Sequence, residues 1–309
     1  MTQNAVAIGV DVFITYPGIE DREEDSFAEA RKISGFGVIN PGYALDQIRL
    51  CTEFSGGNKV LLQQLLSLHG AAEAVDFCTV WFTPSRPEGS IRVLRPTVWG
   101  SPIYKSVTRQ LFAPEEGGDL AYEIEGLADT GSSVLDFDVS HLSQEERLLR
   151  WNLLNALAPL AMASAHSQFY LGQPGRHKCW RYCAERGRLP LGWQWQPDWS
   201  TYQKQVEVLT TTFARKEERS LYRDALGSGV FYWAQLLSVG GREILRFWAL
   251  PTMAPLQILA SLDAIDSWLE EAVLAMRGLK PSSLAELPLY QGRRIPEDQS
   301  VRLYLWESQ

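Results

Sequence analysis

The sequence predicts an α+β fold in which a mostly antiparallel sheet has helices packed on one face. Segments with the length and apolar character of strands fall in neighbouring groups between helices, an order typical of an antiparallel or mixed sheet rather than a doubly wound parallel one. Two runs of strong β-formers flank Gly240-Gly241, which is the pattern of a β-hairpin. Longer segments with apolar residues at helical spacing lie between these groups.

The expected elements follow one another along the whole chain. Strands are expected where apolar residues form a short run or alternate with polar ones, at 5–16, 45–54, 77–82, 132–139, 230–237 and 243–250. Helices are expected where apolar residues recur every three or four positions, at 23–33, 59–75, 103–112, 263–279 and in a long segment that begins after residue 143.

The long helix has its own start signal. Ser143-Gln144-Glu145-Glu146 is a capping box, in which the serine hydroxyl and a glutamate carboxylate satisfy backbone N–H groups of the first turn. Apolar side chains then occupy nearly every face, so we expect a buried helix that bends at Pro159. Its apolar part is shorter than the roughly 20 residues that a bilayer requires, and Asn152 and Asn155 interrupt it. We therefore expect no membrane span.

Length and composition indicate one large domain, residues 1–309, because no linker divides the chain. A net charge of -8 and a pI near 5.2 argue against nucleic acid as the main partner, since neutralising phosphates requires a basic surface. The first residues lack the basic-then-apolar order of a signal peptide, and four cysteines make no disulfide framework in so long a chain. We expect a cytoplasmic protein, and the sequence does not indicate its oligomeric state.

Four acidic residues lie on expected strands. Asp11 is in the middle of the first strand, Glu53 is at the end of the second, and Asp136 and Asp138 share one face of the strand at 132–139, because strand side chains alternate. A carboxylate on a buried strand must be paired, hydrogen-bonded or bound to a metal. Neighbouring strands would bring such acids together as a Mg²⁺ site. The alternative for each acid is a bond to a turn or to an arginine.

Residues 150–188 carry an apolar helix into a polar loop that is broken by glycine and proline and ends in a cluster of cations. A loop delivered in this way presents side chains to a ligand, and Arg181 is its candidate functional cation. His177, Cys179 and Cys183 lack the spacing of a zinc site, so we expect them to belong to the scaffold.

Several short blocks follow one another in an order that resembles a known family. They are Ile8-Gly9-Val10-Asp11, Cys51-Thr52-Glu53-Phe54-Ser55-Gly56, Trp81-Phe82-Thr83-Pro84, Pro102-Ile103-Tyr104-Lys105, residues 133–140, and the helix and loop at 143–181. The chain resembles the glutamate-cysteine ligase family, especially its plant and proteobacterial branch, within the carboxylate-amine ligases that have a glutamine-synthetase-like sheet. The block at 143–181 is the most specific, because its spacing from Gly172 to Arg181 matches the family loop without a gap.

The resemblance implies an enzyme that forms an amide bond through an acyl phosphate, with ATP and Mg²⁺ as cofactors and a small amino-acid or carboxylate substrate. It implies that Asp11, Glu53 and Asp136 bind the metal ion. It also implies that Arg181 acts in catalysis by neutralising a phosphate or a substrate carboxylate, and that Lys105, Arg181 and Asp136 contact the nucleotide. The implied fold is a single glutamine-synthetase-like catalytic domain.

The chain departs from the family pattern at four positions. Phe13 stands where the opening strand has its second glutamate, and Val134 stands where the ligand strand usually has histidine or glutamine. Ala249 and Pro251 replace a metal-binding glutamate and a substrate-binding arginine. These departures favour an altered substrate. They also support an alternative hypothesis, a non-catalytic relative that binds a small molecule or a protein partner.

Overall fold

A seven-strand sheet organises the part of the chain that the computed structural model describes, which comprises residues 5–15, 38–41, 47–54, 58–73, 79–83, 87, 131–169, 195–213, 233–281 and 286–287. Its strands are β1 (Ala5–Thr15), β2 (Val38–Pro41), β3 (Gln47–Cys51), β4 (Thr79–Trp81), β5 (Ser132–Asp138), β6 (Ala234–Val239) and β7 (Arg242–Pro251). The strand order is β2-β3-β1-β5-β7-β6, with β4 paired to β1, and the pairings between these strands are antiparallel. The helices are α2 (Asn58–Glu73), α6 (Gln144–Phe169), α8 (Trp199–Phe213) and α10 (Pro255–Met276).

The central strand β1 gives the sheet two different faces. It pairs with β3 along one edge and with β5 and then β4 along the other. Val10 and Val12 point to one face and are fully buried, whereas Gly9 and Asp11 point to the opposite face. The neighbouring strands repeat this alternation in register, so one face of the sheet is apolar and the other is polar.

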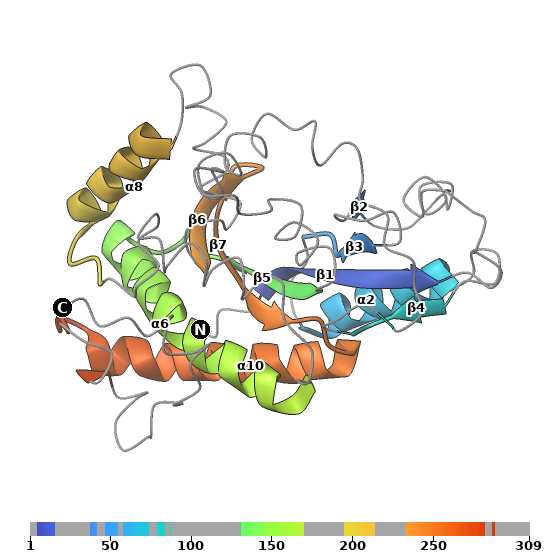
Figure 1. Ribbon diagram of the computed structural model, residues 1–309. Helices are drawn as coiled ribbons and strands as arrows, with labels where there is room; N and C mark the ends of the chain where they lie inside the picture. The colour runs from blue at the N-terminus through green and yellow to red at the C-terminus, as the bar shows by residue number, and fades with distance from the viewer. Residues whose placement is uncertain are drawn as a thin grey trace, which may run out of the picture.

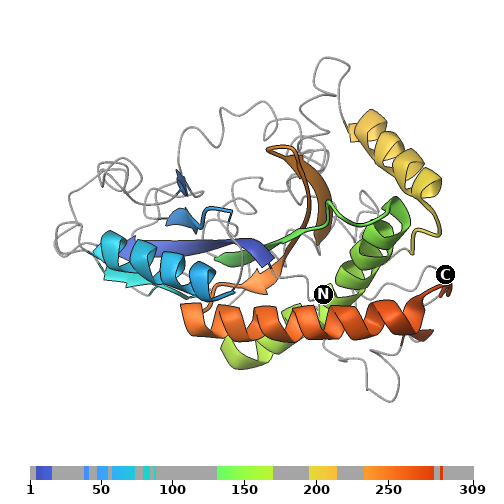
Figure 2. The same cartoon turned by 180° about the vertical axis from the view of Figure 1, so that it is seen from behind.

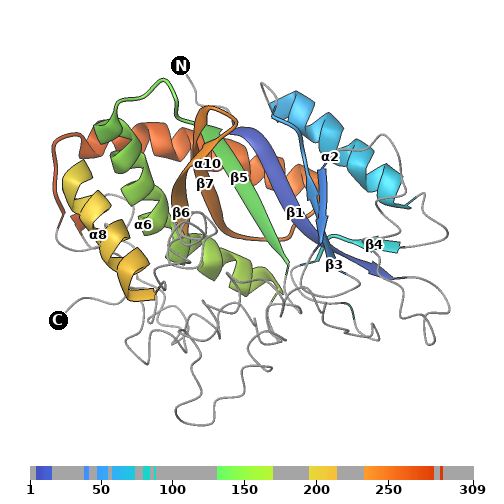
Figure 3. The same ribbon diagram turned by 90° about the horizontal axis from the view of Figure 1, so that it is seen from above.

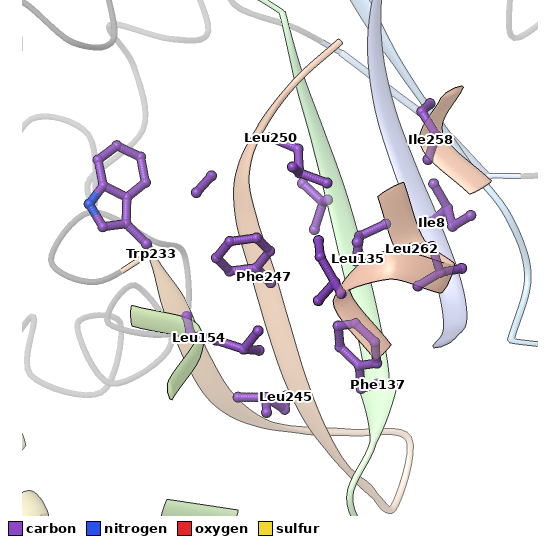
Figure 4. Close-up of a cluster of buried hydrophobic side chains, with 14 of the residues drawn as sticks. Ile8, Leu135, Phe137, Leu154, Trp233, Leu245, Phe247, Leu250, Ile258 and Leu262 are labelled. Atoms are coloured by element: carbon purple, nitrogen blue, oxygen red, sulfur yellow. The ribbon is translucent and has the colours of Figure 1, made fainter. Parts of the chain in front are cut away.

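Helices α2, α6 and α10 pack on the apolar face. Figures 1 and 2 show α10 running along this side of the sheet from opposite views, with α2 beside it. In Figure 4, Ile8, Leu135 and Phe137 of the sheet lie next to Ile258 and Leu262 of α10. Removing such side chains from water contributes about 25 cal/mol per Å² of apolar surface, so this layer provides the main stabilisation of the fold.

The apolar helix α6 uses two asparagines to hold later segments of the chain. The Asn152 side chain donates to the carbonyl of Gln196 (2.9 Å) and accepts from its N–H group (2.8 Å). Asn155 Oδ1 accepts from the backbone N–H groups of Trp233 and Ala234, at 3.0 and 3.1 Å, where β6 begins. The two residues that interrupt the apolar pattern of this helix therefore fix the positions of segments far along the sequence.

The expected fold class is confirmed as an α+β protein with a mostly antiparallel sheet and helices packed against it. The capping box is present, because Ser143 Oγ accepts from the Glu146 N–H group at 3.3 Å and Glu146 Oε2 accepts from the Ser143 N–H group at 3.2 Å. The hairpin is also present. Gly240 and Gly241 have φ angles of 57° and 78°, which a two-residue turn of the type I′ kind requires.

Three features of the fold differ from the sequence expectation. Strand β2 was not expected, since it is only four residues long and ends in a proline. Helix α8 was not expected either, because its three successive threonines have low helix propensity. It lies against α6 at the edge of the molecule (Figure 3), where Tyr202 meets Trp151 edge to face with ring centroids 5.1 Å apart. Helix α10 begins at Pro255 rather than Asp263, and a proline suits the first turn of a helix.

Other expectations fall outside the described residues, namely the helices at 23–33 and 103–112. Helix α6 is described as far as Phe169, and the expected loop beyond it lies outside these ranges up to residue 194. Within the described helices, none is both long enough and apolar enough to cross a membrane.

A buried cluster of charges connects α6 to α10. Arg150 of α6 is 6% exposed, and its Nη2 atom lies 2.9 Å from Oε1 of Glu270. Asp266 lies one turn before Glu270 on α10 and is 7% exposed. Burial raises the pKa of Asp266 from 3.8 to about 6, and the negative charge of Glu270 raises it further, against the opposing effect of Arg150.

The raised pKa of Asp266 predicts a pH-dependent stability. A carboxyl group whose pKa is higher in the folded state contributes stability below its unfolded value of 3.8, and this contribution is lost as the pH rises through about 6. We expect Asp266→Asn to gain stability relative to the unmodified protein between pH 4 and pH 7, by about 1 to 3 kcal/mol. Urea denaturation at both pH values measures this. The control, Glu270→Gln, should lose stability at pH 7, and a gain for both variants would contradict the assignment.

Candidate functional site

The polar face of the sheet carries three pairs of aspartate and arginine. Asp11 of β1 pairs with Arg49 of β3, and Asp136 of β5 pairs with Arg246 of β7. A third pair lies at the hairpin end, where Arg242 Nη1 is 3.6 Å from Asp138 Oδ2. We call these six residues the polar face.

The carboxylate of Asp11 makes the densest set of contacts on this face. Arg49 donates side-on, from Nε to Oδ1 at 2.6 Å and from Nη2 to Oδ2 at 2.9 Å. Ser132 of β5 donates to Oδ2 from its backbone N–H group (3.0 Å) and from its hydroxyl (2.8 Å). The Thr252 hydroxyl, just after β7, donates to the backbone carbonyl of Asp11 (2.7 Å). Both carboxylate oxygens of Asp11 are therefore hydrogen-bonded.

Asp136 and Arg246 repeat the side-on geometry. Arg246 donates from Nε to Oδ1 at 2.7 Å and from Nη2 to Oδ2 at 2.8 Å. These hydrogen bonds raise the pKa of the Arg246 guanidinium above its usual value, while burial and the positive charge of Arg49 act in the opposite direction. Arg49 and Arg246 therefore lie close enough to influence each other electrostatically.

The third pair is looser and lies nearer to solvent. The side chains of Arg242 and Asp138 are 48% and 28% exposed. Arg242 also stacks over the ring of Phe54, with 5.6 Å from its guanidinium carbon to the ring centroid. Burial raises the pKa of the Asp138 carboxyl, but hydrogen bonds from Ser140 and the charge of Arg242 outweigh it and leave the pKa lowered.

Gly9 forms the floor between the two inner pairs. A Cβ atom placed on Gly9 would lie 3.6 Å from Cδ of Arg49, from Sγ of Cys51 and from Cβ of Val134. The aliphatic stem of Arg49 therefore runs across β1 directly above Gly9. Its guanidinium thereby reaches β5, where Nη2 lies 3.5 Å from the Ser132 hydroxyl.

Exposure distinguishes the cations of the inner pairs from the anions. The side chains of Asp11 and Asp136 are 4% and 8% exposed, whereas those of their partners Arg49 and Arg246 are 32% and 33% exposed. A molecule that approaches this face meets guanidinium groups first. Arrangements of this kind present oriented hydrogen-bond donors rather than open carboxylates.

The structure places the candidate residues of the sequence as follows. Asp11 and Asp136 lie on the same face of the sheet, on adjacent strands. Glu53 is exposed, two residues after the end of β3. The candidates Lys105 and Arg181 lie outside the described residues, as do His177, Cys179 and Cys183.

The residues that depart from the family pattern lie close to this face. Phe13 shares the face of Asp11 by strand alternation and is fully buried. Val134 lies above Gly9, and Ala249 is buried in β7. Pro251 is the last residue of β7 and pairs with Ser132 across the strands.

As folded, these donors do not fit a magnesium ion. Mg²⁺ requires carboxylate oxygens that are free to coordinate it in near-octahedral geometry. Both oxygens of Asp11 and both oxygens of Asp136 instead accept hydrogen bonds from arginine. Among the described residues, no group of three or more histidine, cysteine, aspartate or glutamate side chains is placed to hold a metal ion. Pairing with an arginine, the alternative weighed for each acid, is what the structure has at Asp11 and Asp136.

Sequence reasoning did not find Arg49 and Arg246. The available signal was strand alternation combined with register. Asp11 pairs with Arg49, and Asp136 pairs with Arg246, as direct cross-strand neighbours. Opposite charges at such positions attract one another, but the register that brings them together is not visible in the sequence alone.

Comparison with known proteins gives no match: no protein-family model fits this chain, and no curated protein matches its sequence. The resemblance to glutamate-cysteine ligases therefore depends on the short ordered blocks alone, and it stays a prediction. The chemistry of the polar face is the independent observation from which a function can be proposed.

The buried and exposed pairs predict different costs for the same substitution. Asp11→Asn leaves Arg49 without its buried carboxylate, so we expect a loss of about 3 kcal/mol in the free energy of unfolding. Asp138→Asn removes a partly exposed pair and should cost less than about 1 kcal/mol. Chemical denaturation of both variants at pH 7 measures the difference. Equal losses would show that Asp11 is not a buried structural anion.

Proposed function

We propose that this chain is a ligase-like binding protein that holds a small anionic molecule on the polar face of its sheet. The observation that carries the proposal is the orientation of the two inner pairs, with carboxylates buried and guanidinium groups partly exposed. Guanidinium groups bind carboxylate and phosphate groups through paired, charge-assisted hydrogen bonds. A small amino-acid or carboxylate ligand fits this chemistry.

The architecture supports a ligase-like origin. A mostly antiparallel sheet with helices on its apolar face and charged side chains on the other agrees with the glutamine-synthetase-like domain that the sequence blocks imply. Fold alone does not determine function, however, and the site chemistry has to decide between binding and catalysis.

The second candidate is an ATP- and Mg²⁺-dependent carboxylate-amine ligase. The position of Asp11 and Asp136 on adjacent strands of one face favours it, since both are metal ligands in the family that the chain resembles. In this case a substrate carboxylate would take the terminal phosphoryl group of ATP, and an amine would then displace phosphate to form the amide. Arg181 and Lys105 would neutralise the phosphates. Arg49 and Arg246 would first have to release the two aspartates.

A retention experiment tests the proposed binding function. The purified protein is mixed with a metabolite extract and washed by ultrafiltration, and the retained small molecules are identified by mass spectrometry. We expect retention of a carboxylate- or phosphate-containing molecule that is lost in Arg246→Ala, because this variant removes one of the exposed guanidinium groups. Arg277→Ala is the matched control, since Arg277 lies at the end of α10, where its only partner among the described residues is Glu146.

Adding ATP and Mg²⁺ to the same mixture separates the two candidates. Release of ADP together with a new amide product, abolished by Asp136→Asn, would favour the ligase over the binding protein. Equal retention by the unmodified protein and Arg246→Ala would contradict a ligand site on the polar face.

A further inference from the structure

We infer that Arg49 and Arg246 together bind one oxyanion, a carboxylate or a phosphate group, and that they do so without a divalent cation. The inference rests on the proposed binding function and specifies the chemical group that the ligand presents to the polar face. It also specifies which atoms of the protein hold that group.

The hydrogen-bond geometry identifies the donors. Arg49 and Arg246 each use Nε and Nη2 for their aspartate, so Nη1 of each guanidinium remains outside the side-on pair. Among the described residues, Nη1 of Arg246 has no hydrogen-bond partner. The aspartates fix the plane of each guanidinium and thereby fix the direction in which Nη1 donates. Such preorganisation reduces the entropy that a ligand must remove on binding.

The two guanidinium groups converge over the same strand. Arg49 starts from β3 and crosses above Gly9 to reach Ser132 on β5, and Arg246 starts from β7 and reaches Asp136 on β5. The charge of Arg49 lowers the pKa of Arg246, which is evidence of their proximity. Two like charges brought together in this way repel each other, and an anion placed between them would relieve that repulsion.

The same contacts disfavour a divalent cation. Binding a metal ion at Asp11 would require the loss of hydrogen bonds from Arg49 and from Ser132. The ion would also approach past two partly exposed guanidinium groups that repel it. The guanidinium groups thus supply the positive charge that a metal ion would otherwise provide.

Calorimetric titration with two simple probes tests this inference. Inorganic phosphate and succinate are each titrated into the full-length protein in the presence of EDTA and, separately, of excess Mg²⁺. We expect at least one probe to bind in EDTA, with an affinity that Mg²⁺ does not increase. Binding of phosphate alone or of succinate alone would identify which of the two groups the site accepts.

Lysine variants distinguish directed hydrogen bonds from general charge attraction. Arg49→Lys and Arg246→Lys keep the charge and can still pair with the buried aspartates, but they lose the planar fork. We expect each to weaken probe binding about tenfold, as the loss of one charge-assisted hydrogen bond would. Arg277→Lys, the same substitution at a distant and exposed pair, should bind the probe like the unmodified protein.

A measurement on the unmodified protein guards against variants that fold poorly. Saturating probe should shift the side-chain Nε–Hε NMR signals of Arg49 and Arg246 and leave that of Arg277 in place. Probe binding that requires Mg²⁺, that survives both lysine variants, or that leaves these signals unmoved would overturn the inference.

Failure of this inference can be told apart from failure of the proposed function. If neither probe binds, but a metabolite is retained and then lost in Arg246→Ala, the polar face binds a ligand of another class and only the inference fails. If retention is the same in Arg246→Ala as in the unmodified protein, both fail.

Discussion

The buried carboxylate of Asp11 is the constraint on which the polar face depends. It connects three strands, because it lies on β1, accepts two hydrogen bonds from Arg49 on β3 and accepts two from Ser132 on β5. A carboxylate that is 4% exposed loses most of its hydration, and it can stay charged only if such partners replace the water. The close approach of β5 therefore follows from the need to satisfy Asp11. Gly131 belongs to this approach, since a Cβ atom there would lie 2.4 Å from Oγ1 of Thr252.

This arrangement divides the work of the sheet between its faces. The apolar face packs against α2, α6 and α10 and supplies most of the stabilisation. The polar face adds little net stability, because buried ion pairs gain roughly what their desolvation costs. Its effect is to orient two guanidinium groups towards the outside of the sheet. A rigid sheet that presents oriented donors is better suited to bind a ligand than flexible surface arginines are, since less side-chain entropy is lost.

Local signals in the sequence were sufficient to predict much of the fold. The capping box at Ser143, the paired glycines at 240 and 241 and the apolar alternation of β1 and β5 each act over a few residues, so each was visible. Helix α8 was not visible, because packing of Trp199 and Tyr202 against α6 compensates for a poor local propensity. The candidate acids Asp11 and Asp136 were found as buried strand carboxylates. Their arginine partners were not, since the partners depend on strand order and register, which are long-range properties.

Manganese binding, followed by electron paramagnetic resonance, tests most directly whether the aspartates are committed to their arginines. Mn²⁺ is a spectroscopic substitute for Mg²⁺ and reports bound and free ion separately. We expect the unmodified protein to show no tight Mn²⁺ site that depends on Asp11 or Asp136. Arg49→Ala and Arg246→Ala should expose the two carboxylates and increase Mn²⁺ binding. A tight site in the unmodified protein that disappears in both Asp11→Asn and Asp136→Asn would contradict a polar face built from aspartate–arginine pairs and would restore the metal-dependent interpretation.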